Sequence, residues 1–289
     1  MEPEPPGLED TWRPAARAGQ AKNRDMTYTS AYTEHYHKEG ASGQSYDRSL
    51  ANKFELAIFQ LEHQFLLDLF RRLRSSDPAT RYLDFACGTG RILAVFKDLI
   101  RSKLGVDTSP GQLEVARQKV PDAEFLCGNV VTNPELLSER RFDLITSFRL
   151  LLNLEPENRV PILRALGGHL APKGYLVVDN HMNRYSILGF MALLAHKVLR
   201  VPKKPLVPRG RRGIISTMSE REMRQTLAAA GLQVHELCRI FVLPGHKSLL
   251  LLPTRWLIPL ETFLSRVPLV NRFSKNQIYV CSVIQQNQL

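Results

Sequence analysis

Hydrophobic positions recur at helical spacing in the first strongly patterned part of the chain. Residues 49–74 predict an amphipathic helix with one buried face, because apolar side chains return there at three- and four-residue steps. These side chains are Leu50, Phe54, Ile58, Leu61, Phe65, Leu69 and Leu73. Asp77 and Pro78 end the pattern, and the run RYLDFAC at 81–87 then predicts a short buried strand.

After this strand the pattern alternates between helices and strands. Strands are predicted at 103–107, 123–129, 142–148 and 174–180, and helices at 91–100, 109–120, near 133–140 and at 160–170. Strands separated by helices of about ten residues form a parallel sheet with right-handed crossovers, the doubly wound α/β arrangement. A helix at 219–230 follows, and the closing strands at 232–243 and 277–284 are of the kind that pairs antiparallel at a sheet edge.

The turn after the first strand consists of small residues, Ala86-Cys87-Gly88-Thr89-Gly90. Glycine adopts positive φ angles and lets the backbone approach a ligand closely. Gly-x-Gly between a strand and a helix also serves as a purely structural turn, so the turn alone leaves both interpretations open. Asp84 precedes it and Asp107 ends the next strand, where a carboxylate is the usual acceptor for a ribose hydroxyl pair.

Charge is unevenly placed along the 289 residues, whose formal net charge is +11. The segment between Asn180 and Ser219 has no Asp or Glu and should attract phosphates or an anionic surface. Its basic residues are Arg184, Lys197, Arg200, Lys203, Lys204, Arg209, Arg211 and Arg212. The four cysteines have no CxxC spacing, so neither a zinc site nor a disulfide framework is indicated, no metal is expected and a reducing cytosol fits best.

The organisation along the chain predicts a tail and one domain. Residues 1–26 are rich in Pro, charge and small residues, which predicts a disordered tail without the features of a secretory signal. Residues 27–289 are expected to form a single domain, with 181–218 as an insertion over the substrate and 244–275 as an apolar, basic cap segment. The longest apolar runs are too short and too interrupted to span a bilayer, so we expect a cytoplasmic protein, with peripheral membrane attachment as a further option.

Six segments, in order, resemble the motifs of the class I S-adenosylmethionine-dependent methyltransferases, over roughly 49–180 and more loosely to the C-terminus. DFACGTG at 84–90 looks like the first motif, with Ala86 where a first glycine is common, and VDTSPGQLEVAR at 106–117 resembles the second. FLCGNV at 125–130 resembles the third, with Asn129 in place of the acid that accepts a hydrogen bond from the adenine amine. FDLITSFRLLLNL, LAPKGYLVVDN and MSEREMRQTLAAAGLQVHEL look like the fourth-strand, fifth-strand and sixth-strand motifs.

This resemblance implies a Rossmann-like fold with a seven-stranded, mostly parallel sheet and an antiparallel last strand. It implies S-adenosyl-L-methionine as cofactor, with Asp107 on the ribose, Asp84 near the amine and the small-residue turn under the carboxypropyl arm. The implied cofactor-binding residues are Asp84, Ala86, Cys87, Gly88, Gly90, Asp107, Thr108, Asn129, Val130, Ser147 and Phe148. Leu93 stands where a nicotinamide fingerprint has its third glycine, which disfavours a dinucleotide.

The sequence indicates the residues around the methyl acceptor less clearly than those around the cofactor. A base for a hydroxyl acceptor would lie near the ends of the fourth and fifth strands, and His181 directly follows the fifth; a histidine that only bonds loop backbone is the plain alternative. Tyr36 and Tyr46 lie in a segment that often folds over the cofactor as a lid in the resembled family. With Arg149 and Arg184 they are the candidate lid and substrate residues.

The insertion indicates what the acceptor is. Its first part is apolar and its second part is basic without acids, which suits a helix lying on anionic lipid; two core-facing cap helices with solvated basic ends are the alternative. We therefore predict O- or C-methylation of a small-molecule acceptor that is lipid-like or lipid-linked. An RNA methyltransferase is the nearest enzymatic alternative, and a catalytically silent S-adenosylmethionine-binding scaffold is the alternative from another class.

Overall fold

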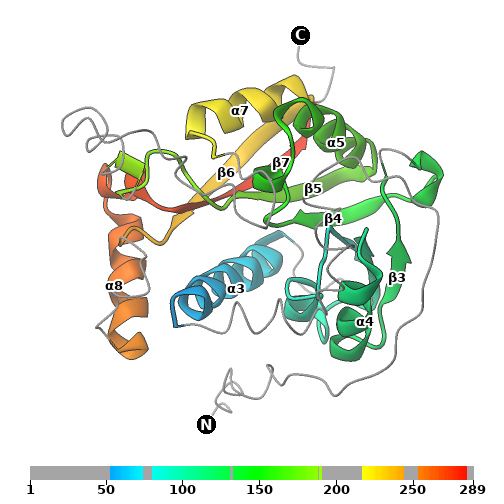
Figure 1. Ribbon diagram of the computed structural model, residues 1–289, viewed down its shortest axis with the longest axis horizontal. Coiled ribbons are helices and arrows are strands. Elements are labelled where there is room, and N and C mark those ends of the chain that lie inside the picture. Colours follow the sequence, from blue (N-terminus) through cyan, green and yellow to red (C-terminus); the bar gives the residue numbers. More distant parts are fainter. Residues whose placement is uncertain are drawn as a thin grey trace.

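The structure is a computed structural model that describes residues 53–73, 80–130, 133–187, 189–190, 217–243 and 253–284. Its centre is a seven-stranded sheet of order β3-β2-β1-β4-β5-β7-β6 (Figure 1). The strands are β1 (Arg81–Phe85), β2 (Ser102–Asp107), β3 (Glu124–Cys127), β4 (Phe142–Ser147), β5 (Leu170–Asn180), β6 (Leu232–Ile240) and β7 (Asn276–Val283). Strands β1 to β5 pair in parallel, and β7 runs antiparallel between β5 and β6. The predicted mostly parallel sheet with an antiparallel last strand is confirmed.

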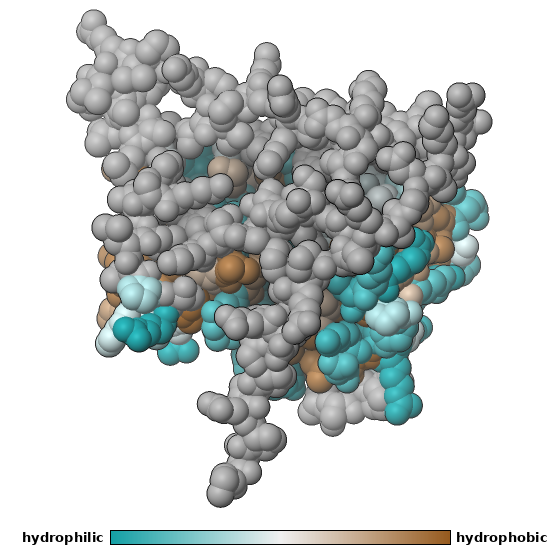
Figure 2. Space-filling model, turned by 60° about the horizontal axis from the view of Figure 1, so that its bottom comes forward, coloured by the Kyte–Doolittle hydropathy of each residue, from teal (hydrophilic) through white to brown (hydrophobic). Residues whose placement is uncertain are grey.

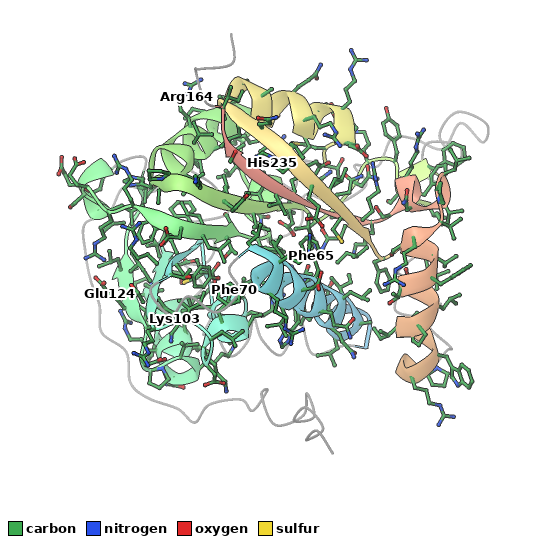
Figure 3. All side chains as sticks on the ribbon, turned by 180° about the vertical axis from the view of Figure 1, so that it is seen from behind. Phe65, Phe70, Lys103, Glu124, Arg164 and His235 are labelled. Atoms are coloured by element: carbon green, nitrogen blue, oxygen red, sulfur yellow. The ribbon has the colours of Figure 1, made fainter. Side chains whose placement is uncertain are left out.

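Helices cover both faces of this sheet. Figure 1 shows α5 (Pro156–Gly168) and α7 (Glu220–Ala229) on one side, and α3 (Lys53–Leu73) and α4 (Pro110–Lys119) on the other. A hydrophobic core lies on each face of the sheet, and the side chains of β1 alternate between the two. Leu83 packs with residues of α5 and α7, whereas Tyr82 packs with residues of α3. Figure 2 shows apolar side chains surfacing between polar ones on one face of the molecule. In Figure 3, Phe65 and Phe70 mark α3 and His235 marks β6.

The prediction of an α-helix at 91–100 is wrong. Only the 3₁₀ helix η1 (Leu93–Phe96) forms there, with turns on either side. The N–H of Leu93 donates to Asp84 Oδ2 at 3.1 Å, a bond that an α-helix would direct to the carbonyl of Thr89. The Ala94 amide donates four residues back, to the Gly90 carbonyl, but the amides of Val95 and Lys97 donate only three residues back.

The predicted helix near 133–140 is likewise a short 3₁₀ helix, η2 (Pro134–Leu136). Its amides also bond three residues back, and Ser138 ends the segment with a φ of 48°. The helix predicted at 219–230 is confirmed as α7, which begins with a capping box. The Glu222 N–H donates to Ser219 Oγ, and the Ser219 N–H donates to Glu222 Oε2.

The proline-containing apolar segment near the C-terminus forms a helix, α8 (Thr254–Arg266), with Pro259 inside it. The remaining short elements are the 3₁₀ helices η3 (Leu151–Asn153) and η4 (Val270–Phe273). Within the described ranges, no helix is both long enough and apolar enough to cross a bilayer. The predicted tail at 1–26, Tyr36 and Tyr46, most of the 181–218 insertion and residues 244–252 of the cap segment lie outside the described residues.

Candidate active site

A pocket opens where β1, β2 and β4 end at their carboxyl edge. It is lined by the small-residue turn after β1, by Asp107 and the start of α4, and by the segment that follows β4. In an open parallel sheet this edge is where ligands bind, because the strand order reverses there. In the described order β3-β2-β1-β4-β5, the reversal falls between β1 and β4. The predicted position of the turn is therefore also the position of the pocket.

The turn after β1 is held in left-handed backbone conformations. Ala86, Gly88 and Gly90 have φ angles of 57°, 54° and 74°. Ala86 adopts this region at a steric cost that the two glycines avoid. A Cβ at Gly88 would lie 2.7 Å from Gln112 Oε1, and Gln112 itself lines the pocket. The absence of a side chain at Gly88 therefore leaves room at the pocket floor.

Asp107 connects this turn to the next element. Its Oδ2 accepts a hydrogen bond from the Gly88 N–H at 2.8 Å, and its Oδ1 accepts one from the Ser109 N–H at 2.9 Å. Ser109 is the residue before α4, so the carboxylate fixes the start of that helix as well. Thr108 and Asn129 line the pocket beside it. Asp107 is thereby oriented at the rim of the pocket by backbone donors.

Asp84 lies beneath the turn and is fully buried. It accepts hydrogen bonds from the Leu93 N–H and from the Thr146 hydroxyl, the latter at 2.7 Å. The Thr146 hydroxyl also bonds the buried Tyr82 hydroxyl at 2.7 Å. Burial raises the pKa of Asp84 to about 7, although these hydrogen bonds act in the opposite direction. Asp84 thus changes charge near neutral pH at the bottom of the pocket.

Two arginines on the wall of the pocket are held by helix α3. Arg149 Nη2 donates to Glu55 Oε2 at 2.7 Å, and Arg91 Nη1 donates to Glu62 Oε2. The ring of Phe59 lies between these pairs, with the guanidinium carbons of Arg91 and Arg149 at 4.0 Å and 4.9 Å from its centroid. Helix α3 therefore sets the positions of the cationic groups that face the pocket.

Comparisons with known proteins agree with this geometry. A family model described as "Methyltransferase domain" matches residues 83–174, the range that holds the turn, Asp107 and Arg149. Residues 83–174 thus form a methyltransferase domain of the class I, S-adenosylmethionine-dependent type. In sequence, this methyltransferase is 33% identical over 103 residues to the demethylmenaquinone methyltransferase of Renibacterium salmoninarum, which is 35% of this chain and 41% of that protein. It thus spans about two-fifths of the length of that curated relative.

Solved structures show the same fold at low sequence identity. Magnesium protoporphyrin IX methyltransferase (ChlM) from Synechocystis PCC 6803 with bound SAH gives a TM-score of 0.58 at 12% identity, covering 87% of this chain and 98% of that chain. The DhpI-SAM-HEP complex gives a TM-score of 0.55 at 15% identity, covering 88% of this chain and 99% of that chain. The predicted Rossmann-like methyltransferase fold is confirmed by these likenesses.

Most of the predicted cofactor residues of the methyltransferase come together at the pocket. Those that line it are Asp84, Ala86, Cys87, Gly88, Asp107, Thr108, Asn129 and Phe148, and the predicted substrate residue Arg149 joins them. Gly90, Val130 and Ser147 are outside the lining; Val130 packs into the core and Ser147 is buried. Burial and the nearby carboxylates raise the pKa of the Cys87 thiol well above its usual value, so this cysteine is neutral.

Several pocket residues were not predicted from the sequence. Gln112 belongs to the first turn of the helix after Asp107, and Arg91 directly follows the Gly-x-Gly turn, so their positions in the chain were the available signal. Asn153, Asn158 and Ile162 reach the pocket from η3 and α5, and no motif marked them. The second candidate substrate residue, Arg184, lies outside the pocket lining and binds Glu222 and the Thr217 carbonyl, each at 2.7 Å.

His181 and Asp179 lie at the end of β5, beyond Arg149. The Arg149 N–H donates to Asp179 Oδ1 at 2.6 Å, and Asp179 Oδ2 is 3.9 Å from His181 Nδ1. Both of the latter atoms are buried and have no hydrogen-bond partner among the residues that the structure describes. Burial, then the cations Arg149, Lys275 and Arg91, lower the pKa of His181 well below its usual value, so its imidazole is neutral. Burial, then Glu62, raise the pKa of Asp179 to about 7.

The same cluster has the composition of a metal site. Ligand atoms of Glu62, Asp179 and His181 lie within 4.8 Å of one another, a mixture of oxygen and nitrogen that divalent transition metals accept. Both oxygens of Glu62 already accept hydrogen bonds, from Asn276 Nδ2 and Arg91 Nη1. A metal would therefore have to compete with the Arg91 guanidinium for this carboxylate.

Proposed function

We propose that the protein transfers the methyl group of S-adenosylmethionine to a small-molecule acceptor of lipid-like character. The single observation that carries this proposal is the bond between Gly88 and Asp107, which joins the left-handed turn and the acid after β2 into one rim. A ligand with a charged amino acid arm and a ribose needs both parts at once: bare backbone for the arm and a carboxylate for the hydroxyl pair. The match of residues 83–174 to a methyltransferase family model supports the same reaction.

The residues at the pocket fit the parts of this cofactor. Asp107 would accept from the ribose hydroxyls, Asn129 from the adenine amine, and Asp84 would attract the cationic amine. The turn at Ala86 and Gly88 would lie against the carboxypropyl arm. The sulfonium itself supplies the reactive methyl group, so the chain has to align the acceptor and exclude water.

The acceptor side would be formed by the cluster beyond Arg149. His181 is the candidate base, because a neutral imidazole with a free ring nitrogen can take a proton from an acceptor hydroxyl. Asp179 Oδ2, at 3.9 Å from His181 Nδ1, would stabilise the imidazolium that forms. Arg149 links this cluster to the cofactor pocket, because it lines the pocket and its backbone N–H donates to Asp179 Oδ1.

The lipid-like character of the acceptor rests on two observations. The distant curated relative is named for demethylmenaquinone, and the segment between Asn180 and Ser219 is apolar and then basic without an acid. Because the match covers only 35% of this chain and 41% of that relative, it supports a class of acceptor and not a specific compound. An acceptor with an apolar body and a polar, reactive head would suit both the buried cluster and the basic surroundings.

The test of the proposal has a binding arm and a turnover arm. Calorimetry of the full chain should give one S-adenosylmethionine bound per chain and no binding of NAD⁺ under the same conditions. The protein should then convert the bound cofactor to S-adenosylhomocysteine when a membrane lipid extract is added. Binding of NAD⁺ in place of S-adenosylmethionine would contradict the cofactor assignment, and binding without turnover on any cell extract would favour the silent scaffold.

A further inference from the structure

Helix α8 presents a row of large apolar side chains to solvent. Trp256 and Phe263 are each 63% exposed, and Leu260 between them is 37% exposed. Positions 256, 260 and 263 are four and three residues apart, so they share one face of the helix. The opposite face is buried through Leu257 and Glu261, which are 1% and 0% exposed. Side chains of α8 project away from the sheet in Figure 3.

The exposed row continues beyond the helix. Leu269 and Phe273, around η4, are 66% and 40% exposed. Phe190 is 51% exposed and its ring centroid lies 6.3 Å from that of Phe273. We call the exposed side chains Trp256, Leu260, Phe263, Leu269, Phe273 and Phe190 the α8 surface. An apolar surface of this extent on one side of a protein marks a place where something binds.

The charged side chains that α8 and η4 expose are all arginines. Arg255, Arg266 and Arg272 are exposed beside it. From Leu237 to Leu289 the chain has one acid, Glu261, and that carboxylate is turned inward. Its two oxygens accept hydrogen bonds from the Leu243 and Val242 amides at 2.8 Å and 2.7 Å. Within the described part of 253–284, therefore, aromatic and basic side chains face outward without an exposed acid among them.

We propose that the α8 surface docks on a bilayer that contains anionic lipid. Tryptophan, phenylalanine and leucine would enter the boundary between headgroups and acyl chains, while the arginines would meet the lipid phosphates. A second copy of the chain is a poorer occupant, because a two-fold contact through this surface would place arginines against arginines. Charge complementarity thus selects the anionic bilayer over self-association.

The docking surface is connected to the pocket through one helix. Leu257 and Ile258 of α8 belong to the same core as Ala57 and Ile58 of α3, and Figure 1 shows α3 between α8 and the strands that end at the pocket. The Glu55 of α3 pairs with the pocket residue Arg149. This proposal deepens the proposed function, on which its purpose rests: a protein docked through α8 would meet a lipid-like acceptor at the surface where that acceptor resides.

The first test uses the fluorescence of Trp256. The chain has two tryptophans, so Trp12→Phe leaves Trp256 as the only one. Titration of this full-length variant with vesicles of phosphatidylglycerol and phosphatidylcholine should shift its emission to the blue, and brominated lipid should quench it. Added salt should weaken the binding, and pure phosphatidylcholine should bind more weakly. An emission spectrum that stays unchanged with saturating anionic vesicles would overturn the proposal.

The second test compares substitutions on α8 with substitutions elsewhere in the chain. Trp256→Ser with Phe263→Ser, and separately Arg255→Glu with Arg266→Glu, should each lower vesicle affinity by about tenfold or more. Leu99→Ser and Arg101→Glu are the matched controls, because both residues are exposed and neither belongs to the α8 surface, and they should bind vesicles like the parent. Unchanged vesicle binding by both α8 variants would overturn the proposal, as would burial of Trp256 by self-association or by RNA in preference to vesicles.

Binding of S-adenosylmethionine distinguishes the two proposals. The α8 variants should bind the cofactor as the parent does, because none of the substituted residues lines the pocket. If the parent binds S-adenosylmethionine but does not bind vesicles, the proposed docking surface is refuted and the proposed reaction is unaffected. Vesicle binding without any cofactor binding would remove the proposed reaction and leave the docking surface.

Discussion

The Gly88 N–H donates to Asp107 Oδ2 at 2.8 Å, so the turn that ends β1 and the acid that ends β2 form one unit. Nineteen residues separate the two in the chain. The second oxygen of Asp107 holds the start of α4 through the Ser109 N–H. Removal of this carboxylate would therefore release both the turn and the helix start, in addition to removing the expected ribose contact.

Asp107→Ala is expected to weaken S-adenosylmethionine binding. Loss of a bidentate hydrogen-bonding partner costs about 1 to 3 kcal/mol, which is roughly a ten- to hundredfold increase in Kd. Isothermal titration calorimetry of the two proteins measures this directly. Asp98→Ala is the matched control, since Asp98 is exposed and does not line the pocket. An Asp107→Ala protein that binds as tightly as the control would place the cofactor elsewhere.

Gly90→Ala is expected to lower the free energy of unfolding by about 1 to 3 kcal/mol. Gly90 has a φ of 74°, and a Cβ there would lie 3.0 Å from Ala116 Cβ and 3.2 Å from Ala116 Cα. Gly168→Ala is the control, because a Cβ at that helical position meets nothing within 4 Å. Urea unfolding should show a gain of up to about 1 kcal/mol for the control. Equal stabilities for the two variants would mean that the turn does not need its left-handed backbone.

Cofactor binding is expected to strengthen with pH through the ionisation of Asp84. Its pKa of about 7 means that the carboxyl is mostly neutral below that pH and anionic above it. The anionic form attracts the cationic amine of the cofactor, so the affinity should rise about fivefold between about pH 6 and about pH 7. Asp84→Asn should remove most of this dependence. A parent protein whose Kd is the same at both pH values would contradict the contact between Asp84 and the amine.

His181→Ala is expected to affect turnover and not cofactor binding. His181 is outside the pocket lining, so the Kd for S-adenosylmethionine should stay within about twofold. If the imidazole takes the acceptor's proton, kcat should fall about a hundredfold or more. The control is His235→Ala, because His235 is an exposed residue that bonds Ser282 on the neighbouring strand β7. Full turnover by the His181 variant would show that the base lies elsewhere or is not needed.

The sheet and the rim of the pocket could be predicted because they depend on local pattern. Alternating strands and helices imply a parallel sheet, and a turn of small residues after the first strand has to lie at its carboxyl edge. Asp107 ends the second strand, so its proximity to the turn followed from the pairing of β1 with β2. The prediction of an α-helix after Gly90 was wrong. The sequence pattern does not show that the Leu93 N–H donates to the Asp84 side chain.

The contacts of the acceptor side could not be predicted because they join distant parts of the chain. Glu55 and Arg149 are 94 residues apart, and the pattern of α3 indicated only that one of its faces is buried. Glu62 is fully buried, and Arg91 and Asn276 each donate to one of its oxygens, which periodicity alone does not reveal. The inward turn of Glu261, which leaves the α8 surface free of exposed acids, is a tertiary feature of the same kind.

The most direct test of the central claim follows the methyl group itself. The purified protein and methyl-labelled S-adenosylmethionine are incubated with extract from the source cells, and the label is counted in lipid, nucleic acid, protein and water-soluble small-molecule fractions. The account predicts label in the lipid fraction, lost in Asp107→Ala and retained in Asp98→Ala. Label confined to RNA, or no label in any fraction despite measurable cofactor binding, would contradict a methyltransferase that acts on a lipid-like small molecule.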